Sequence, residues 1–445
     1  MPSANPGRVA IVGTGSRGLM FVNGIAERPN SIVVALCDQN TVRSEYYNQV
    51  LEGQGRPRAP IFKPEQFGEM LVSERVDTVV ITTVDATHHL YIIPALKAGV
   101  RVITEKPMTT AVEKCRAINQ ACKQIGKHIT VTFNYRYNPV HEVVKRTIAE
   151  GQIGNVLSVH FEWLLDTVHG ADYFKRWHAN KENSGGLMVH KSGHHFDLVN
   201  WWLDAQPSEV AGMGRLAFYG DKNGKQHGWA CDYKRAQGSE QANQDPFAIH
   251  IEADEQLNKL YGPDAHKVDG YERDRNCFQS GINIEDDVGL LVRYNSGAIM
   301  TYHLTAYNPW EGYRVMFNGT KGRLELEVVE STHRLGKEAM TSTGAVHGTS
   351  PAPHVGPSRV SLHPLWEPSR DVPIVIEHGS HGGGDTRMLN ILFGPRPGEA
   401  VEAGDASKQA ATERDGTLAL AVGLAANESF MTGKFVKVSD LALDG

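Results

Sequence analysis

Residues Arg8–Gly18, RVAIVGTGSRG, decide how the first part of this chain folds. The apolar run Val9–Val12 is typical of a buried strand, and it leads directly into a G-x-G-x-x-G turn. In such a turn Gly13 permits the tight bend, Gly15 lets the backbone approach a pyrophosphate, and Gly18 lets the following helix pack closely. Because N–H groups at a helix start hold phosphates, the sequence predicts a dinucleotide site rather than a glycine-rich turn without a ligand. The residues of the predicted phosphate turn are Gly13, Thr14, Gly15, Ser16, Arg17 and Gly18.

Strand-like and helix-like segments alternate from the N-terminus to residue 133. The predicted strands are Val9–Val12, Ile32–Cys37, Thr78–Thr82, Arg101–Thr104 and His128–Thr132. The predicted helices are Gly18–Ala26, Thr41–Leu51, Pro64–Ser73, His89–Ala98 and Ala111–Ile125. This order indicates right-handed βαβ units, and therefore an α/β fold with a doubly wound parallel sheet of the Rossmann type.

Asp38 follows the second predicted strand, close to the spacing expected of a residue that binds the adenosine ribose. A carboxylate at that position accepts hydrogen bonds from the ribose hydroxyls and repels a 2′-phosphate. Arg17 and Arg43 weaken this preference if either one pairs with a phosphate. We expect NAD as the cofactor, with NADP as the less favoured alternative.

Lys106 lies in the segment Ile103–Pro107, ITEKP, at the end of a predicted strand. Ligands of parallel α/β sheets bind at the carboxyl ends of the strands, and the stretch Thr82–His88 lies at the same edge. Pro107 disfavours a helical conformation at Lys106. We therefore expect this side chain at the nicotinamide crevice, as a catalytic lysine rather than a solvated one.

Several motifs together resemble one enzyme family. They are GTGSRG at 13–18, the strand end with Asp38, TTVDATHH at 82–89, ALKAGVRVITEKP at 95–107, FNYRYNP at 133–139 and a later Gly-Gly…His…Asp segment. With them the chain resembles the glucose-fructose oxidoreductase / inositol dehydrogenase / MocA (Gfo/Idh/MocA) family of NAD(P)-dependent sugar oxidoreductases. In that family the EKP lysine contacts the reacting hydroxyl of a sugar or polyol, and the resemblance assigns this role to Lys106. Beyond the turn and Asp38, we expect cofactor contacts from Thr83, His88, Glu105, Lys106 and Asn134.

The pattern of the chain changes near Phe133, where we place the domain boundary. It separates an NAD-binding domain, 1–133, from a substrate-binding and oligomerisation domain, 134–445. The resemblance implies that the second domain is α+β, with a large open, mostly antiparallel sheet. Within it we expect irregular insertions at about 220–280 and 335–390 and a C-terminal helix at about 415–431.

A histidine-rich stretch follows Gly186, and a helix is predicted from about Leu187 onward. His190, His194 and Asp197 then recur on one helical face. In the family the pattern is usually Asp, then His four residues on, then Asp; His194 matches its acid/base histidine, whereas His190 replaces the first Asp. A histidine near neutral pKa can take the hydroxyl proton as the hydride leaves, and Lys106 can stabilise the alkoxide.

Two alternatives apply to these histidines. They are core residues, or His190, His194 and Asp197 form three metal ligands. No H-E-x-x-H motif is present and the family generally needs no metal, so we expect none. Our catalytic candidates are Lys106, His194 and His190.

Aromatic and cationic residues gather at 172–178, a composition that suits a sugar site, although plain core packing is the alternative. We expect the substrate contacts to come from this segment and its surroundings. The candidates are Arg136, Tyr137, Tyr173, Trp177, His178, Lys191, His195 and Trp310.

Composition narrows the class of partner. The 445-residue chain has a formal net charge of -6 and five scattered cysteines. No basic face indicates nucleic acid, no apolar run is long enough for a membrane helix, and no disulfide framework is evident. We expect a cytoplasmic enzyme that acts on a small carbohydrate, and the resemblance implies a homodimer or homotetramer packed sheet to sheet.

Two other functions stay open. Some relatives of the family keep NAD bound and hydrolyse glycosides by oxidation, elimination, water addition and reduction, and the additional histidines leave room for such a second base. A non-catalytic NAD-binding protein is the third hypothesis. The sequence favours hydride transfer between NAD and a hydroxyl carbon of a sugar, glycoside or polyol.

Overall fold

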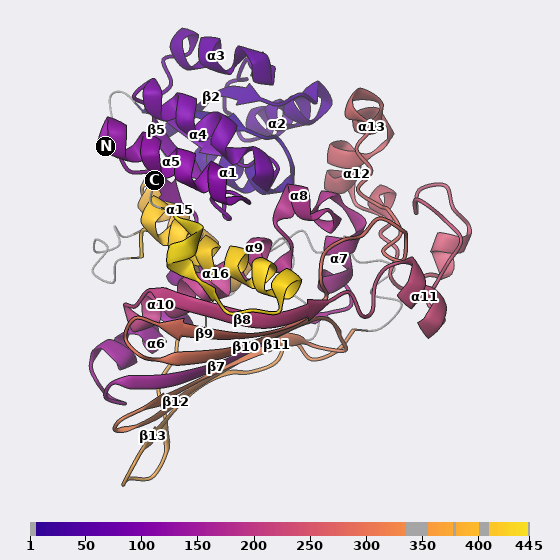
Figure 1. Cartoon of the computed structure of the whole chain (residues 1–445). Helices are drawn as coiled ribbons and strands as arrows, with labels where there is room; N and C mark the ends of the chain where they lie inside the picture. Colours follow the sequence, from indigo (N-terminus) through magenta and orange to yellow (C-terminus); the bar gives the residue numbers. More distant parts are fainter. Residues whose placement is uncertain (1–5, 335–354, 377–379, 400–408, 444–445) are drawn as a thin grey trace.

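A computed structural model describes residues 6–334, 355–376, 380–399 and 409–443. It consists of two sheets with helices between and around them (Figure 1). A parallel sheet built from the start of the chain lies at one end, and a larger mixed sheet lies at the other. The predicted fold class is confirmed. In the described residues no helix is long and apolar enough to cross a membrane.

The first sheet has six parallel strands in the order β3-β2-β1-β4-β5-β6. Its strands are β1 (Gly7–Val12), β2 (Ser31–Cys37), β3 (Ile61–Phe62), β4 (Thr78–Ile81), β5 (Arg101–Thr104) and β6 (Thr130–Val131). The connecting helices are α1 (Ser16–Ala26), α2 (Thr41–Gly53), α3 (Phe67–Ser73), α4 (His88–Lys97) and α5 (Val112–Ile125). Every predicted strand and helix of this region is present, and the short edge strand β3 is an addition. Its two residues are too few to form a recognisable apolar run.

The second sheet has nine strands in the order β14-β13-β12-β11-β7-β10-β9-β8-β15. All neighbours are antiparallel except β10 and β7. Its strands are β7 (Val156–Asp166), β8 (Pro207–Arg215), β9 (Asp287–Tyr294), β10 (Ile299–Asn308), β11 (Glu311–Gly319), β12 (Gly322–Ser331), β13 (Ser358–Pro364), β14 (Arg370–Asp371) and β15 (Val436–Lys437). The mostly antiparallel sheet that the resemblance implies is therefore observed.

Helices of the second region cover the face of this sheet that is turned toward the first sheet (Figure 1). They are α6 (Pro139–Ala149), α7 (His169–Lys175), α8 (Lys181–Ser184), α9 (Leu187–His190), α10 (Gly193–Leu203) and α16 (Glu413–Thr432). Helix α15 (Gly384–Phe393) instead packs against α1 of the first region. Helix α16 matches the predicted C-terminal helix. A capping box between Thr412 and Asp415 starts it, and Gly433, at φ 67°, ends it.

The structure differs from the single helix predicted after Leu187. The helix is broken at Lys191 and Ser192, where the Ser192 N–H donates to the Leu187 carbonyl and the His195 N–H donates to the Ser192 carbonyl. The first bond spans five residues and the second spans three, instead of the four of a regular α-helix. His190 and His194 therefore end and begin separate helices, instead of sharing one face.

Residues 220–280 are more ordered than the loop-like composition predicts. They include α11 (Asp221–His227), α12 (Glu255–Tyr261) and α13 (Pro263–Asp269). Helices α12 and α13 lie beside the first sheet in Figure 1, and the Asn40 side-chain amide donates to the Ala265 carbonyl over 2.8 Å. The insertion is thus attached to the first region.

The second expected insertion, 335–390, is also partly regular. β13 and β14 extend the large sheet, and α15 begins inside it at Gly384. Residues 335–354 and 377–379 lie outside the described residues. The glycines at 382–384 hide the start of α15, because glycine is a poor helix former.

Candidate active site

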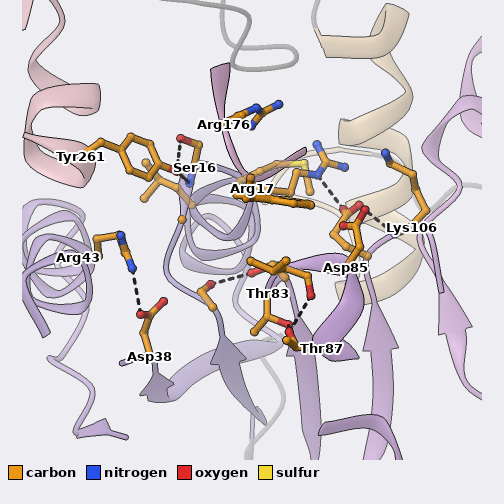
Figure 2. Close-up of a pocket in the computed structure, with 18 of the residues that line it drawn as sticks. Ser16, Arg17, Asp38, Arg43, Thr83, Asp85, Thr87, Lys106, Arg176 and Tyr261 are labelled. Carbon is orange, nitrogen blue, oxygen red and sulfur yellow. Dashed lines mark hydrogen bonds and ion pairs between the residues drawn. The ribbon is translucent and has the colours of Figure 1, made fainter. Parts of the chain in front are cut away.

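One cavity of about 590 Å³ lies between the carboxyl ends of the parallel strands and the second region (Figure 2). Its volume is within the usual range for a small-molecule site. The following predicted site residues line it: Gly13, Gly15, Ser16, Arg17, Asp38, Thr83, Glu105, Lys106, Asn134, Trp177, His178, His190 and His194.

The glycine turn forms the cofactor end of this cavity. Gly13 has φ 89°, and a Cβ there would lie 2.8 Å from backbone atoms of Thr82 and Thr83, so no other residue fits without displacing β4. The start of α1 has no side-chain cap and no acidic residue in its first turn. A helix start without an N-cap side chain, together with the positive end of the helix dipole, fits a dinucleotide pyrophosphate. Thr14 and Gly18 support the turn from behind rather than line the cavity.

Tyr261 of α12 reaches this same helix start. The Ser16 N–H donates to the Tyr261 hydroxyl over 2.8 Å, and the two hydroxyls are 3.0 Å apart (Figure 2). The Ser16 N–H, which could otherwise bind a phosphate, therefore already donates to Tyr261 of the insertion. Sequence reasoning could not foresee this contact, because the two residues are 245 positions apart.

Asp38 is held rigidly at the end of β2. Its Oδ2 accepts from the Thr14 N–H at 2.7 Å and its Oδ1 accepts from the Asn40 N–H at 2.8 Å. The Arg43 guanidinium bridges Asp38 and Asp269 of α13, with 3.4 Å between its Nη2 and the Asp38 Oδ1. Arg43 is thus occupied by two carboxylates.

Arg17 belongs to an ion-pair network under the cavity. Its Nε donates to Glu105 Oε1 at 2.7 Å, and its Nη2 lies 3.2 Å from Asp385 Oδ1. The Asn134 side chain donates to that same Asp385 oxygen over 2.7 Å. Asp385 lies in the first turn of α15, so the network attaches α15 to the first region.

Lys106 lies at the catalytic end of the cavity. Its Nζ donates to the backbone carbonyl of His190 over 3.1 Å. Burial lowers the pKa of Lys106 to about 8, although the nearby carboxylates of Asp85 and Glu105 oppose that effect. The lysine is thus poised to gain or lose a proton near neutral pH.

His190 is paired with a residue that sequence reasoning missed. Its Nδ1 lies 2.5 Å from Oδ2 of Asp85, which follows β4. Burial raises the pKa of Asp85 well above its usual value and lowers the pKa of His190 well below its own. Asp85 belongs to the TTVDATHH motif, and its place at a strand end was the available signal.

Aromatic rings surround the cavity histidines. His194 stacks on Tyr135 with 4.6 Å between ring centroids. His178 lies against His190 at 4.1 Å and stacks on Trp177 at 3.5 Å. Lys106, which follows β5, and His194 of α10 line the same cavity.

The remaining predicted residues lie outside the cavity lining. They are His88, Arg136, Tyr137, Tyr173, Lys191, His195 and Trp310. His88 is buried, and its ring nitrogens lie 2.9 Å from the Pro107 carbonyl and 3.2 Å from the Thr83 carbonyl. It supports the loops that form the cavity rather than facing a ligand.

Partners within the fold occupy several others of these side chains. Arg136 donates to both carboxylate oxygens of Asp197, at 2.8 and 2.6 Å. His195 is stacked on Trp163 at 4.1 Å, and that same ring lies 4.6 Å from the Lys191 Nζ. Arg136, His195 and Lys191 have side chains of the kind that bind substrates. In this structure they are buried and contact other residues of the core instead.

The other three are placed similarly. Tyr173 is fully buried, and its hydroxyl lies 3.0 Å from His169 Nε2. Tyr137 packs in the core against α1 and α15. The Arg314 guanidinium lies over Trp310, 5.4 Å from the ring centroid.

The metal alternative finds no support in the geometry. Asp197, one of the three suggested ligands, is bound by Arg136. Within the part of the chain that the structure describes, no group of three or more His, Cys, Asp or Glu side chains is arranged to hold a metal ion.

Comparisons with protein families cover almost the whole chain. Residues 7–133 match the model described as "Oxidoreductase family, NAD-binding Rossmann fold" (GFO_IDH_MocA). Residues 145–438 match its companion, "Oxidoreductase family, C-terminal alpha/beta domain".

Individual proteins of known name are also similar. The chain is 37% identical over 353 residues to YteT of Bacillus subtilis strain 168, spanning 75% of this chain and 76% of YteT. It is 22% identical over 407 residues to glycosyl hydrolase family 109 protein 2 of Shewanella sp. MR-4, spanning 90% and 79% of the two chains. The fold matches aldose-aldose oxidoreductase of Caulobacter crescentus with a TM-score of 0.60 at 17% identity, covering 97% of this chain and all of that one.

Proposed function

This chain belongs to the Gfo/Idh/MocA oxidoreductase family, and from that premise we propose that it moves a hydride between NAD and a hydroxyl carbon of a sugar, glycoside or polyol. One observation carries the proposal. The glycine turn, Lys106 and His194 line a single cavity, so a cofactor and a carbinol can be bound next to one another.

The residues at the cofactor end favour NAD over NADP. Asp38 is available to the ribose hydroxyls, and Arg43, the cation nearest to it, is held between Asp38 and Asp269. A 2′-phosphate would meet two carboxylates and would have to displace Arg43 from both. When bound, NAD⁺ supplies the hydride acceptor.

The residues at the catalytic end handle the proton. Oxidation of a carbinol releases its C–H as a hydride and its O–H as a proton, and a carbonyl forms. We assign the proton to His194, and we assign stabilisation of the developing alkoxide to the Lys106 ammonium. His190, fixed by Asp85, orients the hydroxyl from the other side. His190 and His194 are buried, and Lys106 is half-buried beside them.

The test is a substrate panel. Purified protein is incubated with NAD⁺ or NADP⁺ and a set of sugars, polyols and glycosides, and NADH absorbance at 340 nm is followed together with product analysis. We expect NADH to form with at least one carbohydrate. Turnover of non-carbohydrate alcohols alone would contradict the assignment.

A glycosidase that recycles its NAD is the second candidate. The similarity to glycosyl hydrolase family 109 proteins supports it, as do the histidines His178 and His190, which offer a second proton carrier beside His194. Release of nitrophenol from nitrophenyl glycosides without added cofactor, by protein that copurifies with NAD, would favour this candidate over net oxidation.

We also propose that the protein forms homodimers or homotetramers through the outer face of the large sheet. Exposed apolar side chains lie on neighbouring strands of that sheet, including Met213 on β8, Leu291 on β9 and Ile299 on β10. Such a patch on a sheet is typical of a subunit interface. Light scattering coupled to size-exclusion chromatography tests this, with Met213→Asp expected to weaken the assembly.

A further inference from the structure

The catalytic end of the cavity holds more positive charge than the proposed hydride transfer requires. Arg176, which follows α7, and Arg273, from the insertion, both line it together with Lys106. Figure 2 shows Arg176 and Lys106 above the strand ends. Neither arginine belongs to the motifs that identify the family.

A single carboxylate pairs with both arginines. Asp172 is fully buried and is shared, with 2.8 Å to the Arg176 Nη2 and 2.6 Å to the Arg273 Nη1. The other two carboxylates at this end have partners of their own: Asp85 is held by His190, and Glu105 pairs with Arg17. The two guanidinium groups therefore share one carboxylate.

Arg176 keeps hydrogen-bonding capacity for a ligand. Its Nε is buried and has no hydrogen-bond partner among the residues that the structure describes. A buried guanidinium donor without an acceptor is costly, and a carboxylate is the acceptor that its planar fork fits best.

The charges of the two arginines act on histidines that line this end of the cavity. Burial lowers the pKa of His178 well below its usual value, and the charges of Arg176 and Arg273 lower it further. The charge of Arg176 has the same effect on His190. The surplus of charge therefore lies where a substrate would react.

We propose that the substrate is a sugar acid, whose carboxylate is received by Arg176 and Arg273 while its carbinol is held at Lys106 and His194. This inference rests on the proposed hydride transfer at a carbinol, and it adds the anionic substrate class and two specificity-determining residues. Unlike a neutral hydroxyl, a carboxylate satisfies the shared cations and forms two parallel hydrogen bonds with one arginine.

The experiment compares sugars with their acids. D-galactose is paired with D-galacturonate and D-glucose with D-glucuronate, and the methyl ester of each acid serves as a neutral match of similar size. NADH formation gives kcat and KM, and calorimetry in the presence of NADH gives the affinity for each compound. We expect the acids to exceed both neutral forms by about 100-fold in kcat/KM or in affinity.

Variants locate the effect. Arg176→Gln should weaken binding of the acid by more than about tenfold and leave that of the neutral sugar unchanged, while Arg176→Lys should retain part of the preference. Arg215→Gln is the matched control, since this exposed arginine pairs with Asp287 on the large sheet. NAD⁺ affinity is measured for each variant by calorimetry.

The outcomes separate this inference from the proposed function. Equal turnover of acids and neutral sugars overturns the carboxylate site and leaves the hydride transfer standing. Tight binding of the acids without NADH formation supports the carboxylate site and contradicts the hydride transfer. The inference is overturned if neither acid binds better than its parent sugar. It is also overturned if Arg176→Gln loses NAD⁺ affinity, because Arg176 would then bind the pyrophosphate of the cofactor.

Discussion

The two ends of the cavity are built in different ways. At the cofactor end, neighbours in sequence form the site: the turn at 13–18 and Asp38 follow consecutive strands. At the catalytic end, Lys106 comes from the parallel sheet, His190 and His194 come from two helices, and Arg273 comes from the insertion. Local motifs supply the turn and Asp38 of the first end, to which the insertion adds Tyr261 and Asp269, whereas tertiary packing assembles the whole of the second. The catalytic end should therefore be more sensitive to single changes in its charged groups.

Lys106→Ala should have the largest effect. Loss of the ammonium removes the charge that stabilises the alkoxide, and we expect kcat to fall about 1000-fold while NAD⁺ affinity changes less than twofold. Steady-state kinetics and calorimetry measure the two quantities. Lys97→Ala, an exposed lysine at the end of α4, is the control. Full activity of the Lys106→Ala variant would remove this residue from the mechanism.

Asp85→Asn should come next. The carboxylate that fixes His190 is lost, and misplacement of a catalytic group by about 1 Å costs roughly 100-fold in kcat. The pKa values seen in the pH dependence of kcat/KM should also shift, which a purely structural role would not produce. Asp287→Asn serves as the control. An unchanged pH profile with normal kcat would show that the pair with His190 has no role.

The pH dependence should report the titration of Lys106. Its ammonium is present below a pKa of about 8 and is lost as the pH rises above it. In the direction of carbonyl reduction, loss of the Lys106 ammonium should make kcat fall about tenfold per pH unit above pH 8, in addition to any change that the His194 proton donor causes. In Lys106→Arg this fall above pH 8 should be absent up to pH 10, because a guanidinium keeps its proton. A fall at the same pH in that variant would assign the titration to another group.

Asp38→Ala tests the cofactor end and should produce a smaller change. We expect the preference for NAD⁺ over NADP⁺, measured as a ratio of dissociation constants, to narrow about tenfold, since one of two carboxylates around Arg43 is removed. Maximal turnover with NAD⁺ should change little. An unaltered ratio would mean that Asp269 alone decides the preference.

Tyr261→Phe should have the smallest effect. The variant frees the Ser16 N–H, and one neutral hydrogen bond contributes about 1 kcal/mol, so NAD⁺ should bind up to about fivefold more tightly. Calorimetry at constant ionic strength measures the change. Weaker binding instead would identify the Tyr261 hydroxyl as a cofactor ligand.

The contrast between the two ends of the cavity also explains which features can be predicted from the sequence. The strands, helices and glycine turn of residues 7–133 follow from periodicity and turn chemistry, both of which are local. A strand end and a proline predict that Lys106 faces the crevice, and the side chain does line the cavity. The chemistry of His195 and Lys191 predicts substrate contacts, but both side chains pack on Trp163 in the core.

Residues of the insertion show the opposite case. Tyr261, Asp269 and Arg273 lie in a polar segment without periodicity, and nothing local indicates that they reach the cavity. Their positions depend on contacts with residues at least 100 positions earlier, such as Asp172 for Arg273 and Ser16 for Tyr261. The break in the helix at Lys191 and Ser192 likewise depends on packing, which the spacing of apolar residues does not reveal.

The network of Arg17, Glu105, Asn134 and Asp385 has a consequence for ligand exchange. These partly buried ion pairs and hydrogen bonds join α15 to the floor of the cavity, so a hinge that separated the two sheets would expose several charges at once. We therefore expect a ligand to enter and leave while the two sheets stay in place.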